Sequence, residues 1–230
     1  MAKVEVREPV KFFNRWTEKL MHKTPTDILN ELGIRCYTGS RDVPKDSEKA
    51  IGFLTAAAQN ATTKKEAQSV TYYDLMVRKF ALNQQLQKDA YRQNPEKLNR
   101  EVLELNTQLH NLATDGHPLA LFSYAKDLYA VVRNGQIEQE MNQVKNTSAK
   151  DVKKEEMKYF KHSKDYFEKA AAKGVNSAYF YLGMIYLDGK YEKVDHEKAL
   201  DYYIKGAAKN NAYCFFELSR LHASGIPEIA

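Results

Sequence analysis

Histidine and cysteine have the widest range of chemistry among the side chains of this sequence, and their spacing argues against a metal site. The histidines are His22, His110, His117, His162, His196 and His222. Only His110 and His117 lie near each other, and a predicted helix end falls between them. A zinc-binding pair at positions i and i+4 is absent, and no cysteine lies near either histidine. The sequence therefore predicts no metal ion.

The other candidate groups for catalysis are equally isolated. Cys36 and Cys214 fall at core positions of predicted helices, so we expect buried small hydrophobic residues, not nucleophiles. The neighbouring acids Glu155 and Glu156 point in different directions on a helix and are poorly placed to share a proton. Asp188 is expected at a turn, and neither a phosphate-binding glycine loop nor a nucleophile elbow occurs. We therefore expect no catalytic residue, no cofactor and no small-molecule substrate.

Composition indicates a folded protein without a membrane span. Of the 230 residues, 43% are hydrophobic and 28% charged, as is usual for globular proteins. The 35 basic and 30 acidic residues are interspersed, whereas a nucleic-acid footprint needs basic residues concentrated on one face. No run of 18 apolar residues occurs, and the N-terminus lacks a secretory core. Two cysteines are too few for a disulfide framework. We expect a cytoplasmic protein, with a mitochondrial or ciliary assembly as the alternative.

The elements that position these side chains repeat along the chain. Residues 165–174 (DYFEKAAAKG) return at 201–210 as DYYIKGAAKN, 36 positions later. The register then holds without a gap, so that Gly183 corresponds to Ser219. Residues 29–60 show the same order after one residue of slippage in a connecting loop. A fixed period of this size indicates a helical repeat array.

The array divides the chain into a leading segment and a series of helix pairs. Residues 1–25 are expected to form an N-terminal helix or cap, and residues 26–230 the helical-repeat domain. Residues 61–112 are either a degenerate repeat with extended helices or an inserted helical hairpin. The polar stretch 134–154 is expected to be an exposed loop. The expected repeats are 26–60, 61–112, 113–174 with the insertion 134–154, 175–210, and a half repeat 211–225.

Three motifs carry a resemblance to a known family. Residues 182–189 (LGMIYLDG), 195–199 (DHEKA) and 203–208 (YIKGAA) resemble the Sel-one-like repeat, a tetratricopeptide-like helical hairpin. Ser219 and His222 depart from this pattern, standing where glycine and tyrosine are expected. The match is specific at 165–225, good at 29–60, partial at 113–135 and weak at 61–112.

This resemblance implies an all-α fold, a right-handed α-solenoid of stacked antiparallel helix pairs. Members of the family usually act as adaptors that assemble other proteins. One branch is secreted and cysteine-rich, with a claimed hydrolase activity, but it needs two cysteines in every repeat. We therefore expect a non-enzymatic scaffold. A structural subunit of a large assembly is the alternative, and a nucleic-acid-binding repeat or a secreted-type hydrolase is less favoured.

The first helix of each pair, helix A, lines the concave face of such a solenoid, where a partner protein is expected. Its residues mix aromatic rings with cations, as protein grooves do. In the half repeat, an apolar face that includes Phe215 and Leu221 lacks a partner helix in the sequence, so we expect another chain or missing sequence to cover it. The candidate binding residues are Phe122, Lys126, Tyr129, Phe180, Tyr181, Met184, Leu187, Phe216 and Arg220. In the first repeat, Asn30, Ile34 and Tyr37 take corresponding places.

Overall fold

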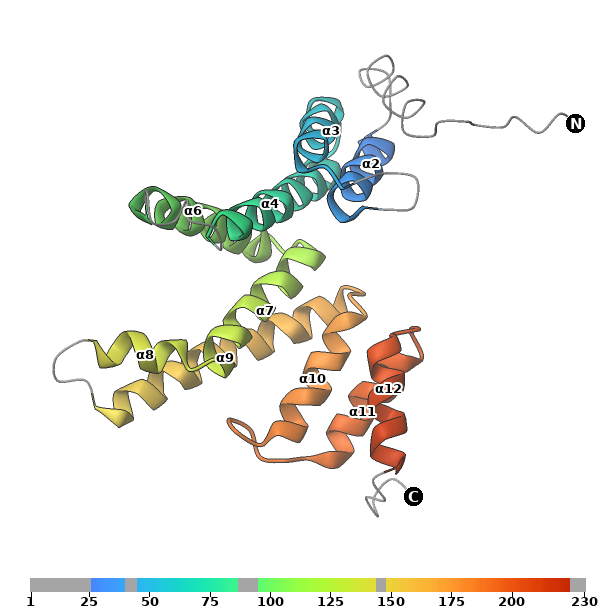
Figure 1. Cartoon of the computed structure of the whole chain (residues 1–230). Coiled ribbons are helices and arrows are strands. Elements are labelled where there is room, and N and C mark those ends of the chain that lie inside the picture. The colour runs from blue at the N-terminus through green and yellow to red at the C-terminus, as the bar shows by residue number, and fades with distance from the viewer. Residues whose placement is uncertain (1–25, 40–44, 87–94, 144–147, 224–230) are drawn as a thin grey trace, which may run out of the picture. The chain divides into compact units, whose positions relative to one another are not determined.

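The computed structural model describes residues 26–39, 45–86, 95–143 and 148–223, and every regular element within these ranges is a helix (Figure 1). This confirms the all-α prediction. The N-terminal helix or cap expected at 1–25 and the end of the half repeat, residues 224–225, lie outside the described residues. No described helix is both long enough and apolar enough to cross a membrane. The chain divides into two compact units, the first ending at Asn111 and the second beginning at Leu112.

The first unit is built on one antiparallel helix pair. α2 and α3 pack along each other, and α4 packs on both. The Asp46 carboxylate caps α3 by accepting a hydrogen bond from the Lys49 backbone N–H at 3.0 Å. The helices are α2 (Thr26–Thr38), α3 (Ser47–Asn60), α4 (Lys64–Leu86) and α6 (Pro95–Thr114), the last of which continues into the second unit. Their buried core includes Leu29, Cys36, Phe53, Leu54, Val70 and Val77.

The second unit continues the alternation of paired helices. α7 packs against α9, α9 against α10, α10 against α11 and α11 against α12, and the last three lie side by side in Figure 1. The helices are α7 (Pro118–Arg133), α8 (Gln136–Asn142), α9 (Ala149–Ala172), α10 (Ser177–Asp188), α11 (His196–Ala207) and α12 (Ala212–Ala223).

A glycine allows α10 and α11 to approach closely. A Cβ atom at Gly183 would overlap the ring of Tyr203, which is fully buried. Glycine costs an exposed helix about 1 kcal/mol relative to alanine, and the tyrosine ring packed against it offsets that cost. α10 then ends at Gly189, whose φ of 69° lies in the left-handed region, and the Asp195 carboxylate caps α11. Gly183, Gly189 and Asp195, which belong to the repeat motifs of the sequence, thus serve in close packing, in a helix end and in a helix cap.

The turn into each helix A of the second unit uses the same backbone conformation. Gly116, Gly174 and Asn210 precede α7, α10 and α12, and their φ angles are 82°, 89° and 61°. Glycine adopts positive φ without steric cost, and asparagine tolerates it better than most residues. The repeat in sequence is therefore also a repeat in turn geometry.

The prediction of an exposed loop at 134–154 is wrong for most of its residues. α8 occupies Gln136–Asn142, and α9 begins at Ala149, six residues before the predicted start at Glu155. Ser148 and Asp151 form a capping box that starts α9, with the Ser148 Oγ accepting from the Asp151 N–H at 3.2 Å. Ile137 of α8 and Val152 of α9 are buried, so both helices have an apolar contact in this stretch despite its polar composition.

Candidate protein-binding face

An aromatic cluster joins α7, α9 and α10. Phe167 on α9 is fully buried and stacks on Tyr181 of α10, with ring centroids 4.8 Å apart and an interplanar angle of 14°. Phe122 of α7 contacts both rings, at 5.9 Å from Phe167 and 5.6 Å from Tyr181. Offset-stacked and edge-on pairs of this kind stabilise a structure beyond the area they bury. Phe167 therefore supports Phe122 and Tyr181, which are half-buried.

The same set of rings continues onto α12. Phe180 lies 5.4 Å from Tyr181 on one side and 5.4 Å from Tyr213 on the other. Tyr213 is 68% exposed, so its ring is accessible at the end of the series. Phe122, Tyr181, Phe180 and Tyr213 thus form a continuous strip across three A helices, which we call the aromatic face.

The aromatic face brings together some of the predicted binding residues and leaves out others. Tyr129 is 5% exposed and belongs to the core, where it contacts Phe167 and Tyr181. Leu187 packs partly buried against the core of α10, α11 and α12, and Met184 is half-buried. Tyr213 was missed, because the repeat places it where Ser177 stands in α10. Its position one helical turn before Phe216 was the signal that could have found it.

One lysine adjoins the aromatic face, and two arginines of the same unit are paired to acids. Lys126 is exposed, and its ammonium lies 5.7 Å from the centre of the Phe122 ring. Arg133 and Asp188 form an ion pair at 2.9 Å between α7 and α10, which gives Asp188 a structural role. Arg220 is exposed on α12 and forms a 2.7 Å ion pair with Glu217. Of these three cations, Lys126 is therefore the one shown beside the aromatic face.

The first unit has a small apolar cavity on its A helix. Ile34 and Tyr37, predicted as face residues, line a cavity of about 170 Å³ together with Tyr72, Tyr73 and Met76. This space is comparable to one large side chain, and burial raises the pKa of the Tyr37 and Tyr73 hydroxyls. The cavity suits an apolar side chain better than a charged group.

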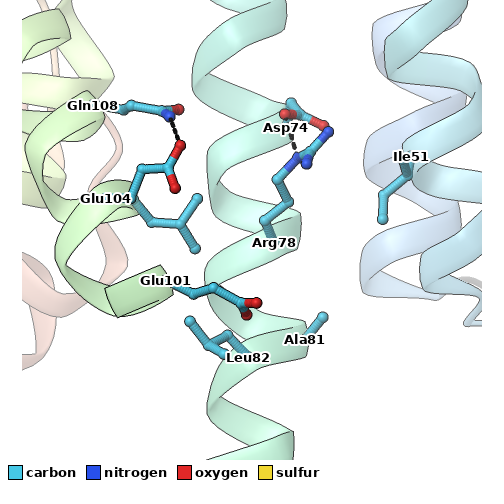
Figure 2. Close-up of a pocket in the computed structure, with 9 residues that line it drawn as sticks. Ile51, Asp74, Arg78, Ala81, Leu82, Glu101, Glu104 and Gln108 are labelled. Carbon is cyan, nitrogen blue, oxygen red and sulfur yellow. Dashed lines mark hydrogen bonds and ion pairs between the residues drawn. The ribbon is translucent and has the colours of Figure 1, made fainter. Parts of the chain in front are cut away.

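A larger, acidic pocket lies between α4 and α6 of the first unit (Figure 2). It has a volume of about 580 Å³ and is lined by Asp74, Arg78, Glu101 and Glu104, among others. Arg78 donates to Asp74 at 2.6 Å, and Gln108 donates to Glu104 at 3.2 Å, as Figure 2 shows. Because three carboxylates and one guanidinium line the pocket, it favours a cationic ligand over an anionic one. Sequence reasoning missed this pocket, although the spacing of Glu101, Glu104 and Gln108 places them along one side of a helix.

His117 and both cysteines take structural positions. His117 caps α7, because its Nδ1 accepts a hydrogen bond from the Ala120 N–H at 3.2 Å, and burial lowers its pKa. Cys36 and Cys214 are fully buried. In the ranges that the structure describes, no three His, Cys, Asp or Glu side chains gather closely enough to hold a metal ion.

We expect both thiols to resist modification in the folded protein. Burial raises the pKa of Cys36 and of Cys214 to about 11, so only roughly one thiol in a thousand is ionised at pH 8. A disulfide reagent that releases a coloured thiolate should react slowly in native buffer and rapidly with two thiols after addition of denaturant. The Cys36→Ser variant should retain one thiol that reacts only after unfolding. Rapid reaction of either thiol in native buffer would contradict the buried placement.

Comparison with known proteins matches the chain to one repeat family. The family model described as Sel1 repeat matches residues 29–61, 160–175 and 176–211, which cover the α2–α3 pair and most of the segment from α9 to α11. None of the curated proteins matches the sequence.

Two solved structures are similar in fold. A Sel1 repeat protein from Oxalobacter formigenes is 19% identical, with a TM-score of 0.55 over 96% of this chain and 77% of that one. The protein c5321, a protective antigen present in uropathogenic Escherichia coli strains and displaying an SLR fold, is 18% identical, with a TM-score of 0.49 over 92% of this chain and 36% of that one. At such identities the first likeness shows the fold alone.

Proposed function

We propose, from the premise that this chain is a Sel1-like repeat protein, that it is a non-enzymatic scaffold that binds a partner polypeptide. The observation that carries this proposal is the aromatic face of the second unit. Its four rings run without interruption across α7, α10 and α12, and they range from half-buried to largely exposed.

The composition and support of the aromatic face suit recognition of a polypeptide. Aromatic residues are enriched at protein interfaces and dominate the binding energy there, because each ring buries a large area at a small entropic cost. The buried ring of Phe167 packs against the rings of Tyr181 and Phe122. These two rings are therefore already positioned in the absence of a partner. Lys126, at the border, adds an attraction for acidic groups on the partner.

A role as a permanent subunit of a larger assembly is the second candidate. It is favoured by Phe215 and Phe216 of α12, which are 52% and 66% exposed. Neighbouring large apolar side chains on a surface indicate an interaction site or an aggregation liability. Analytical ultracentrifugation separates the two candidates, because a dedicated subunit should self-associate when isolated, whereas an adaptor should stay monodisperse.

Replacing Phe180 and Tyr213 together with alanine should weaken partner binding by about 30-fold, or roughly 2 kcal/mol, as expected for central aromatic residues of an interface. The measurement is titration of a partner identified by cross-linking to the full-length chain. Circular dichroism would verify that the double variant is folded.

The matched control is Ile204→Ala, which removes a large apolar side chain that is 52% exposed on α11 and lies outside the aromatic face. It should bind the partner as the unmodified chain does. Equal binding by the unmodified chain and the double variant would refute a role for the aromatic face.

A further inference from the structure

α9 is longer than the repeat requires. It has 24 residues, whereas α11, the second helix of the next pair, has 12. α8 packs on α9 and lies beside its first turns in Figure 1. α8 and residues 149–159 are outside the part of the chain that the family model matches. The repeat therefore does not explain what the first half of α9 is for.

The first half of α9 carries an exposed lysine at every turn. Four such lysines follow one another at intervals of four, four and three residues: Lys150, Lys154, Lys158 and Lys161. Residues at these intervals lie on the same side of a helix. With a rise of 1.5 Å per residue, their positions span about 17 Å along the helix axis. We call these four residues the lysine stripe.

The lysine stripe works against the stability of its own helix. Like charges three or four residues apart on a helix repel each other, and every successive pair in the stripe has this spacing. Cations are also unfavourable near a helix N-terminus, and Lys150 and Lys154 stand in the first two turns of α9. Departures from helix-stabilising rules are expected at functional sites. The stripe is therefore better explained by a function than by folding.

Acids of the same helix balance the stripe only in part. Lys158 pairs with Glu155 at 2.9 Å. Asp151 is engaged in the capping box with Ser148, whose hydrogen bonds lower the pKa of the carboxyl more than Lys154 does. Within the described ranges, the other three lysines of the stripe form no ion pair. The stripe thus has positive charge to offer to a partner.

We propose that the lysine stripe binds an acidic helix of a partner protein, laid side by side with α9. The proposal rests on the proposed function and deepens it, because it names the chemistry of the partner and a contact outside the aromatic face. Charge complementarity carries it. Two helices have the same rise per residue, so glutamates at intervals of three or four residues would meet the lysines turn for turn.

Met157 adds an apolar contact in the middle of the stripe. It stands one turn after Lys154 and one turn before Lys161, and it is half-buried. Methionine is flexible and polarisable, and it adapts to the shape of a bound side chain. The partner helix should therefore present an apolar residue, such as leucine, between its acids.

The lysine stripe suits a protein helix better than a nucleic acid or a membrane. It contains neither arginine nor an aromatic ring, so it lacks the planar donor fork that suits base edges and the rings that stack on bases. Contacts of a few lysines with phosphates give binding that is weak and independent of sequence. A membrane-surface helix needs a free apolar side, but Val152 and Phe160 of α9 are buried within the unit.

The probe is a stapled helical peptide with a glutamate at every turn of one side and a leucine at its centre. Fluorescence anisotropy with the full chain should show saturable binding that weakens as salt is added. Replacing Lys150, Lys154 and Lys161 with glutamine should weaken binding at least tenfold. Because repulsion along α9 is relieved, this triple variant should be at least as stable as the unmodified chain, which thermal unfolding would verify.

The matched control removes the same net charge elsewhere in the second unit. Lys193, Lys205 and Lys209 are exposed and lie outside the stripe, so their replacement with glutamine should leave binding unchanged. A peptide of equal composition with its glutamates scattered around the helix should bind the unmodified chain at least tenfold more weakly. Equal losses in the two triple variants, or equal binding of the two peptides, would overturn the proposal.

The two proposals fail separately in this experiment. The Phe180→Ala/Tyr213→Ala chain should bind the peptide as the unmodified chain does, because the aromatic face is not involved. Absence of peptide binding would overturn the role of the lysine stripe while leaving the aromatic face to its own test. Tighter binding of duplex DNA than of the peptide at the same salt concentration, lost in the stripe variant, would assign the stripe to nucleic acid and also overturn the proposal.

Discussion

Replacing Tyr203 with alanine should lower the free energy of unfolding of the second unit by about 3–5 kcal/mol, the range for large buried aromatic residues. Tyr203 is the largest fully buried side chain of α11, and its ring fills the space that Gly183 leaves open. Alanine would leave a cavity between two helices, and the glycine opposite has no side chain with which to fill it. Denaturant unfolding followed by circular dichroism measures the loss.

The matched control is Tyr203→Phe, which retains the ring and removes the hydroxyl. The hydroxyl is buried without a hydrogen-bond partner in the described structure, and burial raises its pKa. Phenylalanine should therefore be as stable as tyrosine or more stable by about 1 kcal/mol. Because the pKa is raised, the folded protein loses stability as the pH rises above the ordinary tyrosine value of about 10, and Tyr203→Phe should reduce that loss. Equal destabilisation by alanine and phenylalanine would contradict a role for the ring.

Replacing Phe167 with alanine should have an effect of similar size, about 3–5 kcal/mol. Phe167 is fully buried and contacts three other rings, at 4.8 Å from Tyr181, 5.9 Å from Phe122 and 6.2 Å from Tyr129. The alanine variant should also weaken partner binding under conditions where it is still folded, because Tyr181 and Phe122 lose their support. Denaturant unfolding and partner titration measure the two losses.

Phe167→Leu is the control for this variant. Leucine fills most of the space and should cost less than about 1.5 kcal/mol, but it cannot stack on Tyr181. We therefore expect the leucine variant to be nearly as stable as the unmodified chain and to bind the partner more weakly. If it binds as tightly as the unmodified chain, the stacking on Tyr181 does not position the aromatic face.

The 36-residue period best predicted the helices in the segments where the repeat is most regular. α10 and α12 begin at Ser177 and Ala212, within two residues of the starts predicted for their repeats at 175 and 211. Gly183 indicated a close approach because glycine in a helix is costly unless another helix uses the space. The residue that fills this space, Tyr203, could not be named in advance, because a local pattern does not specify which side chain of a neighbouring helix will arrive there.

Features that depend on contacts between distant segments could not be predicted from the sequence pattern. Tyr129 was a candidate for binding, but Phe167 and Tyr181 enclose it in the core. The acidic pocket joins Asp74 of α4 to Glu101 of α6, and nothing in either helix alone indicates that they meet. α8 formed where composition indicated a loop, because burial of Ile137 outweighed the polar residues around it.

The succession of packed helices in the second unit has a mechanical consequence. α12 is seated chiefly on α11, and α11 on α10 and α12. In such arrays each repeat contacts only its neighbours, so stability is approximately a sum of local contributions. A pulling force applied at α12 would therefore detach helices one after another, each at its own load. We expect a helix array of this kind to yield gradually under tension instead of rupturing in a single event.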